Sequence, residues 1–273
     1  RLSSAPLLWA ATGMHIPALI QEQNGFAGLT NKKLGSRVQC ICVAYEGMER
    51  FFPADKIVMT GNPIRSIIVP ATPEMKEAGI KEYGLDPSRK HIFIVGGSLG
   101  SARFNQCMKE WISDGCPGLD GVDVLWQCGK HYRPDIDRFM DEQRTKNPDV
   151  ARHIHHSDFI GRMELAYAAA DLVISRSGAS SVSELCAARK AVIFIPSPNV
   201  AEDHQTHNAM ALVKKDAAVV VKDAEAMEKM IPTALELLKD PARIARLEEN
   251  AGKMALPDAA EKIAEEVYKL IKD

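Results

Sequence analysis

The residues best suited to chemistry lie at three junctions where an apolar run meets a helix-forming segment. The first junction, at residues 94–101, has the sequence IVGGSLGS. Glycines let a backbone turn tightly, and the exposed N–H groups at a helix start favour an anion. An ordinary strand-to-helix turn could use the same glycines. The segment lacks the lysine of a Walker loop and does not fit G-x-G-x-x-G, so it indicates neither ATP hydrolysis nor nicotinamide binding.

The second junction, at residues 175–184, has the sequence SRSGASSVSE. It predicts a strand, a turn of small residues and a helix, with Glu184 near the helix start. The carboxylate of Glu184 could accept two ribose hydroxyls, as acidic residues do in nucleotide-binding folds. It could equally favour the positive end of the helix dipole. The residues themselves leave both interpretations open.

The third junction, at residues 203–208, has the sequence DHQTHN and follows an expected strand. Gln and Asn side chains each offer donors and an acceptor, which suits a polyol such as a sugar. The alternative is that Asp203 is the N-terminal cap of the next helix.

Short apolar runs alternate with longer amphipathic segments along the chain. Strands are expected at residues 16–20, 38–43, 56–59, 92–95, 122–126, 172–174, 191–195 and 218–221. Helices are expected at residues 28–34, 102–112, 135–144, 165–170, 181–188 and 205–214. This alternation predicts right-handed βαβ crossovers and parallel sheets covered on both faces. Ligands of such sheets bind beyond the carboxyl ends of the strands, where the three junctions lie.

Turn-forming residues indicate a domain boundary near residues 65–70. Residues 61–63 are GNP, and residues 69–73 are VPATP, which is typical of a linker before a helix that begins at Thr72. We therefore expect an incomplete α/β unit over residues 1–68 and a complete one over residues 69–254. A last helix, within residues 255–273, is expected to pack back on the first unit. Because the sequence begins without Met and runs directly into a helical pattern, we expect an N-terminal truncation.

Composition excludes several classes of protein. The chain has 273 residues, of which 46% are hydrophobic and 26% charged, as expected for a globular protein. Its net charge of -2 gives no indication of the basic face that nucleic acid needs. No apolar run reaches the roughly 18 residues of a membrane span, so any membrane contact is expected to be peripheral. The six cysteines include no CxxC pair, which favours reduced thiols in a cytoplasmic protein.

Two clusters imitate metal sites. His153, His155 and His156 lie close together, but no second ligand cluster accompanies them, so a role in a strand and turn is favoured over zinc binding. Asp135 and Asp137 imitate a metal-binding DxD motif. They fall in a helical segment, where carboxylates two residues apart point in different directions. We therefore expect no metal.

The motifs in their order along the chain resemble the MurG family of GT-B glycosyltransferases. The series comprises QNGFAGLTN at 23–31, GNPIR at 61–65, GGSLG at 96–100, RSGA at 176–179, SE at 183–184, and Gln205 with Asn208. The resemblance covers nearly the whole chain, and the combination is highly specific although each motif alone is not. It implies two Rossmann-like domains with parallel sheets, the N-terminal one incomplete here.

The resemblance implies a bacterial hexosyltransferase of cell-wall peptidoglycan synthesis. Members transfer GlcNAc from UDP-GlcNAc to undecaprenyl-diphosphoryl-MurNAc-pentapeptide, without a cofactor, at the cytoplasmic side of the inner membrane. The transfer is an inverting single displacement, in which helix N-termini and backbone amides stabilise the departing UDP. The general base and the acceptor site are expected in the absent N-terminal segment. This polypeptide alone is therefore expected to bind the donor and to be inactive.

The resemblance also implies roles for individual residues. Ser98 and the neighbouring amides would hold the diphosphate, the backbone of Ile160 would face uracil, and Arg65 would lie against base and phosphate. Glu184 would take the ribose hydroxyls, Gln205 would bind GlcNAc hydroxyls, and Asn24 would reach the sugar from the opposing domain. The nucleotide would be lined by Ala179, Ser180, Ser181, Val182 and Ser183.

Two alternatives stay open. A UDP-GlcNAc 2-epimerase uses the same scaffold, but would need acid and base carboxylates around the sugar. The chain could instead be a donor-binding module that pairs with a separate acceptor subunit, as in the split eukaryotic GlcNAc transferase acting on dolichol lipid. Residues 1–65 argue against a natural split, because they predict an incomplete sheet with no partner strands.

Overall fold

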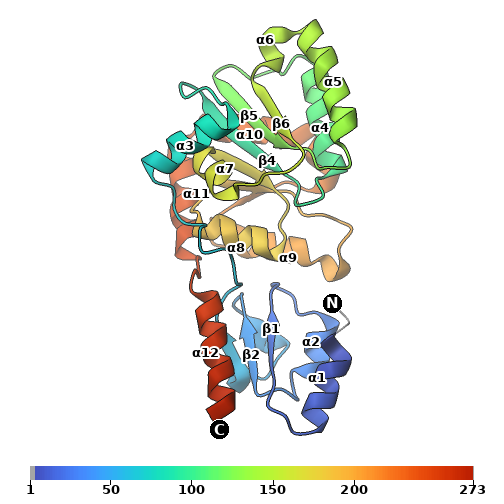
Figure 1. Cartoon of the computed structure of the whole chain (residues 1–273), viewed down its shortest axis with the longest axis vertical. Coiled ribbons are helices and arrows are strands. Elements are labelled where there is room, and N and C mark those ends of the chain that lie inside the picture. Colours follow the sequence, from blue (N-terminus) through green and yellow to red (C-terminus); the bar gives the residue numbers. More distant parts are fainter. Residues whose placement is uncertain (1–3, 273) are drawn as a thin grey trace.

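The computed structural model describes residues 4–272, which form two α/β units stacked along the long axis of the molecule (Figure 1). Residues 1–3 and 273, which begin and end the expected first and last segments, lie outside the described residues. The smaller unit contains α1 (Ser4–Gly13), β1 (Leu19–Glu22), α2 (Leu29–Leu34), β2 (Cys40–Val43) and β3 (Ile57–Met59). Its three strands are parallel and lie in the order β1-β2-β3.

The larger unit follows the linker and begins with α3 (Pro73–Tyr83), which Thr72 caps by accepting a hydrogen bond from the Met75 amide. Its strands are β4 (Lys90–Val95), β5 (Val122–Gln127), β6 (Ile154–Ser157), β7 (Leu172–Ser175), β8 (Val192–Phe194) and β9 (Val219–Val220). Its further helices are α4 (Ala102–Ser113), α5 (Arg133–Lys146), α6 (Pro148–Ala151), α7 (Met163–Ala169), α8 (Ala179–Ala187), α9 (His204–Val213), α10 (Ala226–Leu237) and α11 (Pro241–Lys253).

The six strands of the larger unit are all parallel and lie in the order β6-β5-β4-β7-β8-β9. The chain therefore builds the sheet outward from β4 to β6 and then returns to β7 on the other side of β4. The order reverses between β4 and β7, and this switch point opens a crevice at the carboxyl ends of the two strands.

Helices cover both faces of the larger sheet, and alternate side chains of β4 show the two layers. Ile92 and Ile94 lie in one buried cluster with residues of α4, α5 and α10. Phe93 and Val95 lie in the other with residues of α7, α8 and α9. Because both faces are covered, the strand is apolar throughout, as in other buried parallel sheets.

The chain crosses between the units twice. After α11 it returns to the smaller unit, where α12 (Ala259–Lys272) lies beside the small sheet (Figure 1). There Cys40 Sγ of β2 is 3.8 Å from Glu266 Oε2 of α12. At the crossing, a Cβ on Gly61 would lie 2.6 Å from Leu256 Cβ, so only glycine fits where the two segments meet. None of the described helices is long and apolar enough to cross a membrane.

The expected α/β class with parallel sheets is confirmed, and most expected elements lie where the sequence placed them. The first strand is an exception, because it was expected at residues 16–20 and lies at Leu19–Glu22. Pro17 cannot donate to a strand ladder, and Ile16 is exposed rather than in the core.

Candidate functional site

Two small-residue turns face each other at the switch point. One connects β4 to α4 through residues 96–101, and the other connects β7 to α8 through residues 176–178. Both turns line one cleft of about 520 Å³, together with the start of α9. Among the residues expected at the site, Ser181 and Gln205 line this cleft directly. Backbone N–H groups from two helix starts can therefore act on one ligand.

The first turn needs its glycines. A Cβ on Gly96 would collide with Ser101, and one on Gly100 would collide with the Cys128 carbonyl. Gly97 and Gly100 also have φ values of 94° and 76°, which other residues adopt only with strain. Ser101 then caps α4 by accepting from the Phe104 amide, while Ser98 is exposed on the turn itself. The sequence therefore folds into a tight turn with an accessible tip.

Arg176 joins the second turn to the first. Its guanidinium donates to Asp223 Oδ1 at 2.6 Å, to the Ile195 carbonyl at 2.9 Å and to Ser101 Oγ at 2.9 Å. Arg103 pairs with the same Asp223 carboxylate at 3.3 Å. All three charged side chains line the cleft, so two positive charges and one negative charge surround it. That balance favours an anionic ligand.

Glu184 lies in the second turn of α8, beyond the first turn in which a helix dipole acts. Its carboxylate accepts from Arg65 Nε and Nη2 at 3.2 and 3.1 Å, and from the Tyr167 hydroxyl at 3.3 Å. Arg65 comes from the segment that links the two units. Helix-dipole stabilisation therefore does not explain this residue, which is held in specific contacts.

Gln205 lies at the start of α9, beside the second turn. Its Oε1 accepts from the amides of Ser177 and Ser197, at 3.2 and 2.9 Å. Asp203 occupies the N-cap position of α9, as the alternative expects, but its side chain makes no capping hydrogen bond to the helix backbone. The Asp203 backbone is left-handed, with a φ of 50°, and its carboxylate accepts from the Thr206 hydroxyl at 2.7 Å instead.

Asn24 comes from the smaller unit and meets Asn208 of α9. Asn208 is fully buried, and its Nδ2 donates to Asn24 Oδ1 at 3.2 Å and to the Ser177 carbonyl at 3.1 Å. The Gly25 amide donates to Asn208 Oδ1 at 2.8 Å. Asn24 Nδ2 donates to Glu22 Oε1 at 3.3 Å. Asn208 therefore connects the smaller unit to the second turn of the larger one.

Ile160, Val182 and Ser183 are expected at the site but do not line this cleft. Ile160 follows β6 and is buried in the same cluster as Phe93 and Tyr167. Val182 and Ser183 line a separate cavity of about 800 Å³ between the two units. Ser183 Oγ there accepts from Asn62 Nδ2 at 3.1 Å, so this part of α8 faces the smaller unit.

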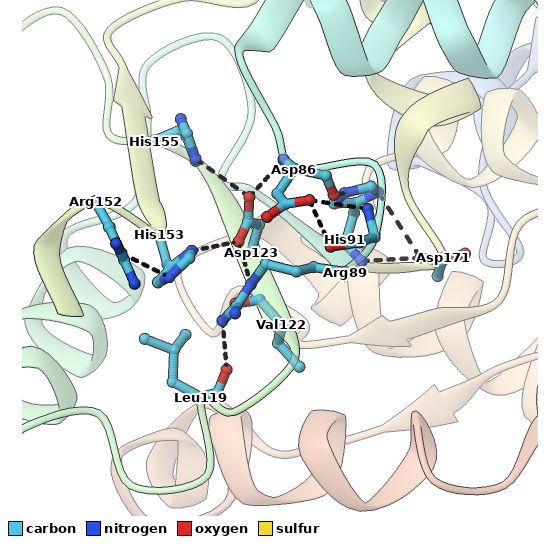
Figure 2. A network of polar contacts seen from close by, with 11 residues as sticks. Asp86, Arg89, His91, Leu119, Val122, Asp123, Arg152, His153, His155 and Asp171 are labelled. Carbon is cyan, nitrogen blue, oxygen red and sulfur yellow. Dashed lines mark hydrogen bonds and ion pairs between the residues drawn. The ribbon is translucent and has the colours of Figure 1, made fainter. Parts of the chain in front are cut away.

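The two clusters that imitate metal sites are ion-pair networks. Asp135 pairs with Lys109 at 2.9 Å, whereas Asp137 pairs with Arg133 at 2.6 Å and His156 at 2.7 Å. His153 and His155 both face Asp123, at the start of β5 (Figure 2). Within residues 4–272, no group of three His, Cys, Asp or Glu side chains could hold a metal.

Comparison with known proteins agrees with this geometry. The family model described as Glycosyltransferase family 28 C-terminal domain matches residues 91–263. The Phocaeicola vulgatus UDP-N-acetylglucosamine--N-acetylmuramyl-(pentapeptide) pyrophosphoryl-undecaprenol N-acetylglucosamine transferase is 49% identical over 273 residues, which cover 98% of this chain and 69% of that protein. The chain belongs to the MurG family of glycosyltransferases.

Other members of the MurG family agree in sequence and fold. The transferase of the same name from Parabacteroides distasonis is 47% identical over 274 residues, covering 98% of this chain and 71% of that protein. The crystal structure of Acinetobacter baumannii MurG superimposes with a TM-score of 0.74 at 27% identity, covering 97% of this chain and 70% of that chain. The expected GT-B fold is therefore confirmed, and the chain is a glycosyltransferase.

Sequence reasoning missed two residues of this candidate site. Arg176 lies inside a quoted motif, but nothing local indicated that its guanidinium would reach Ser101 and Asp223. Tyr167 lies within an expected helix, where an aromatic side chain indicates only core packing. Because their partners are distant in sequence, only the fold brings these side chains together.

Proposed function

We propose that the chain transfers GlcNAc from UDP-GlcNAc to undecaprenyl-diphosphoryl-MurNAc-pentapeptide in peptidoglycan synthesis. One observation carries the proposal: two anion-favouring helix starts share a cleft at the switch point, in a chain 49% identical to a transferase of that name. Because this relative is named a transferase, the similarity also favours transfer of GlcNAc over 2-epimerisation of UDP-GlcNAc.

In this proposal the diphosphate of the donor lies between the two helix starts. Ser98 and the neighbouring amides bind it from the α4 side, and the α8 segment Ala179, Ser180, Ser181, Val182 and Ser183 lines the nucleotide. Each helix terminus contributes about 0.3–1 kcal/mol toward an anion, and up to about 2 kcal/mol where it is partly buried. Arg176 and Arg103 add to this, because Asp223 neutralises only one of their two charges.

The nucleoside is assigned to the side of α8 near the linker. Glu184 accepts the ribose hydroxyls, the backbone of Ile160 faces uracil, and Arg65 lies between the base and the phosphate. The nucleotide lies across the carboxyl ends of β4 and β7, which is the usual position in a doubly wound sheet.

The GlcNAc is assigned to the boundary between the two units. Gln205 uses Oε1 to hold two backbone amides, so its Nε2 is the group that donates to a sugar hydroxyl. Asn24 reaches the sugar from the smaller unit. Its Oδ1 can accept one hydrogen bond beyond the one from Asn208, and its Nδ2 can donate one beyond the one to Glu22.

The proposed chemistry is an inverting single displacement. The acceptor hydroxyl attacks the anomeric carbon while the bond to UDP breaks, and the helix starts stabilise the negative charge that develops on the diphosphate. Closure of the two units about the segment that carries Arg65 orients donor and acceptor and excludes water. Because the acceptor's polyprenyl chain stays in the bilayer, we place the enzyme peripherally at the cytoplasmic face of the bacterial inner membrane.

Thermal unfolding with UDP tests the donor assignment. UDP binds the folded chain, so it is expected to raise the melting temperature. ADP is expected to raise the melting temperature less, because the site is assigned to uracil rather than adenine. Glu184→Ala is expected to reduce this stabilisation by about 1.5–3 kcal/mol, the scale of hydrogen bonds to a charged group. Glu249→Ala, which changes an exposed carboxylate on α11, is the matched control. Equal stabilisation by UDP and ADP would contradict the assignment of uracil.

Product analysis tests the reaction itself. With UDP-GlcNAc and the lipid acceptor, mass spectrometry is expected to detect acceptor that carries one added GlcNAc. Formation of UDP-ManNAc instead would support an epimerase.

A further inference from the structure

The cavity of about 800 Å³ between the two units shares no lining residue with the cleft assigned to the donor. In the smaller unit it is lined by residues 44–47, which follow β2, and by residues 61–62, which follow β3. Its opposite wall comes from α8 and α9, which face the smaller unit (Figure 1). Ligands of parallel sheets bind at the carboxyl ends of the strands, and small-molecule sites occupy about 300–1,000 Å³. The cavity therefore has the position and the size of a ligand site.

Much of the cavity wall is apolar. Unbranched methionine side chains adapt to the shape of a ligand, and three of them come from different parts of the chain. Tyr45 also lines the cavity and is 9% exposed, yet its hydroxyl has no hydrogen-bond partner among the described residues. Buried hydroxyls are normally hydrogen-bonded, so the wall contains a polar group that the protein itself leaves unsatisfied. The apolar part of the wall includes Met59, Val182, Met210, Leu212, Met254 and Leu256.

Positive charge reaches the cavity from both units. Lys215 pairs with Glu46 at 3.3 Å, and Lys253 pairs with Glu249 at 2.7 Å. Within residues 4–272, Arg50 of the smaller unit and Lys214 of the larger unit form no ion pair. Two positive charges are therefore left without a carboxylate, which favours an anion. The cations that line the cavity are Arg50, Lys214, Lys215 and Lys253.

We propose that this cavity binds a small soluble amphiphilic anion, with an apolar body and one carboxylate, sulfate or phosphate group, and that the bound ligand holds the two units together. The apolar body lies against the methionine-rich wall, and the anionic group lies near Lys214 and Arg50. Because the lining residues come from both units, a ligand that contacts them favours the arrangement in which the units touch. The inference goes beyond the proposed function and does not depend on it.

Two fluorescent probes test the charge requirement. 8-Anilinonaphthalene-1-sulfonate (ANS) has an aromatic body and one sulfonate, and N-phenyl-1-naphthylamine has the same body without the sulfonate. Lys214→Gln is expected to weaken ANS binding roughly 2- to 5-fold, the scale of one exposed ion pair, and to leave binding of the neutral probe unchanged. Lys229→Gln, which changes an exposed lysine on α10 outside the cavity, is the matched control. Equal ANS affinity in Lys214→Gln and the wild type would overturn the inference.

Filling the cavity tests where the probes bind. Ala211 of α9 lines the cavity and is partly buried, so Ala211→Phe is expected to reduce binding of both probes. Ala245→Phe is the control, because Ala245 is exposed on α11 and does not line the cavity. Unchanged binding in Ala211→Phe would place the probes elsewhere on the chain and contradict the site. Should Ala211→Phe fail to fold, Lys214→Glu provides the test at an exposed position, where reversal of the charge should weaken ANS binding further than Lys214→Gln does.

Competition with UDP separates this cavity from the donor site. Val182 and Ser183 line the cavity and also belong to the segment assigned to the nucleotide. At a UDP concentration that saturates the donor site, ANS is expected to stay bound. Displacement of ANS by UDP would mean that the cavity is part of the donor site, and would overturn the inference. A chain that binds ANS in the cavity but does not bind UDP would contradict only the proposed function.

Competition with lipids tests the source of the ligand. Because the cavity lies between the units, a ligand must leave any bilayer to enter it. Dodecanoate below its micelle concentration is therefore expected to displace ANS, and phosphatidylglycerol vesicles are not. Displacement by the vesicles alone would contradict a soluble ligand.

Hydrogen exchange tests whether the ligand holds the units together. The Gly25 amide of the smaller unit lies at the cavity and donates to Asn208 Oδ1 of the larger unit at 2.8 Å. Saturating ANS is expected to slow exchange of this amide, and the same ANS concentration should slow it less in Lys214→Gln. Unchanged exchange with ANS bound would contradict the link between this cavity and contact of the two units.

Discussion

Asp123 is a buried carboxylate that makes the stability of the larger unit depend on pH. It lies at the start of β5, at the end of the sheet opposite the cleft, and contacts Arg89, His153 and His155 (Figure 2). Burial alone would raise its pKa, but the nearby His155 ring and hydrogen bonds from the Asp86 amide and His153 outweigh burial and lower it to about 2. The charged carboxylate is therefore stabilised by folding.

The sign of the pH effect follows from that lowered pKa. A carboxyl whose pKa is lower in the folded state stabilises the fold fully when the pH is above its pKa in the unfolded chain, which is near 4. That contribution to stability disappears as the pH falls toward the folded-state pKa of about 2. Asp123→Asn is expected to lower the free energy of unfolding by about 2 kcal/mol at neutral pH. In urea titrations, the difference from the wild type should shrink between about pH 4 and pH 2.

Asp135→Asn is the control, because its pair with Lys109 lies on the surface. It is expected to change the unfolding free energy little, because an exposed ion pair contributes little to stability. If Asp123→Asn were equally mild at neutral pH, the hydrogen bonds around Asp123 would not stabilise the fold as inferred.

At the scale of elements, most of the larger sheet could be predicted from local pattern. Residues 92–95 are apolar without interruption because both faces of β4 are buried, so the run indicates a strand but not which side chain faces which layer. The start of α8 was placed two residues late, at 181 rather than Ala179, because Ala179 and Ser180 carry no strong start signal. That error made Glu184 look like a first-turn residue.

The turn before α4 supports a prediction at this scale. Gly100 has a φ of 76°, and a Cβ there would collide with the Cys128 carbonyl. Gly100→Ala is expected to cost about 1–3 kcal/mol from backbone strain, with the collision added, and to weaken UDP binding by displacing the turn. Gly115→Ala is the matched control, with a φ of 80° and open space around its Cβ.

Denaturant unfolding and UDP affinity separate the two contributions. The control is expected to show the strain alone and to bind UDP normally, since Gly115 follows the far end of α4. Equal loss of stability in both variants would mean that the turn relaxes around the added methyl group.

At the scale of the whole molecule, the contacts between the two units could not be predicted from sequence. Gly25 and Asn208 are separated by 183 residues, and Arg65 and Glu184 by 119. No local periodicity encodes such pairs. The family resemblance predicted that Asn24, Arg65, Glu184 and Gln205 share one donor site. It did not predict that Asn24 contacts Asn208 or that Arg65 contacts Glu184.

Asn208 is expected to control how tightly the units are held together. Its amide bonds Asn24, the Gly25 amide and the Ser177 carbonyl, all in a fully buried position. Asn208→Ala leaves those groups without this partner, and each buried unpaired group costs about 1–3 kcal/mol. The two units should then separate more often, so the Gly25 amide should exchange its hydrogen faster than in the wild type.

His207→Ala is the comparison that isolates the hydrogen bonds. The His207 ring stacks on Phe26 with 4.9 Å between centroids, so this variant removes an apolar contact between the same two segments and leaves Asn208 in place. We expect its Gly25 amide to stay more protected than in Asn208→Ala. Because Asn208 also holds Ser177, which precedes α8, Asn208→Ala should weaken UDP binding as well. If the Gly25 amide exchanged fast in Asn208→Ala while UDP affinity stayed unchanged, Asn208 would not couple the contact between the two units to UDP binding at the donor site.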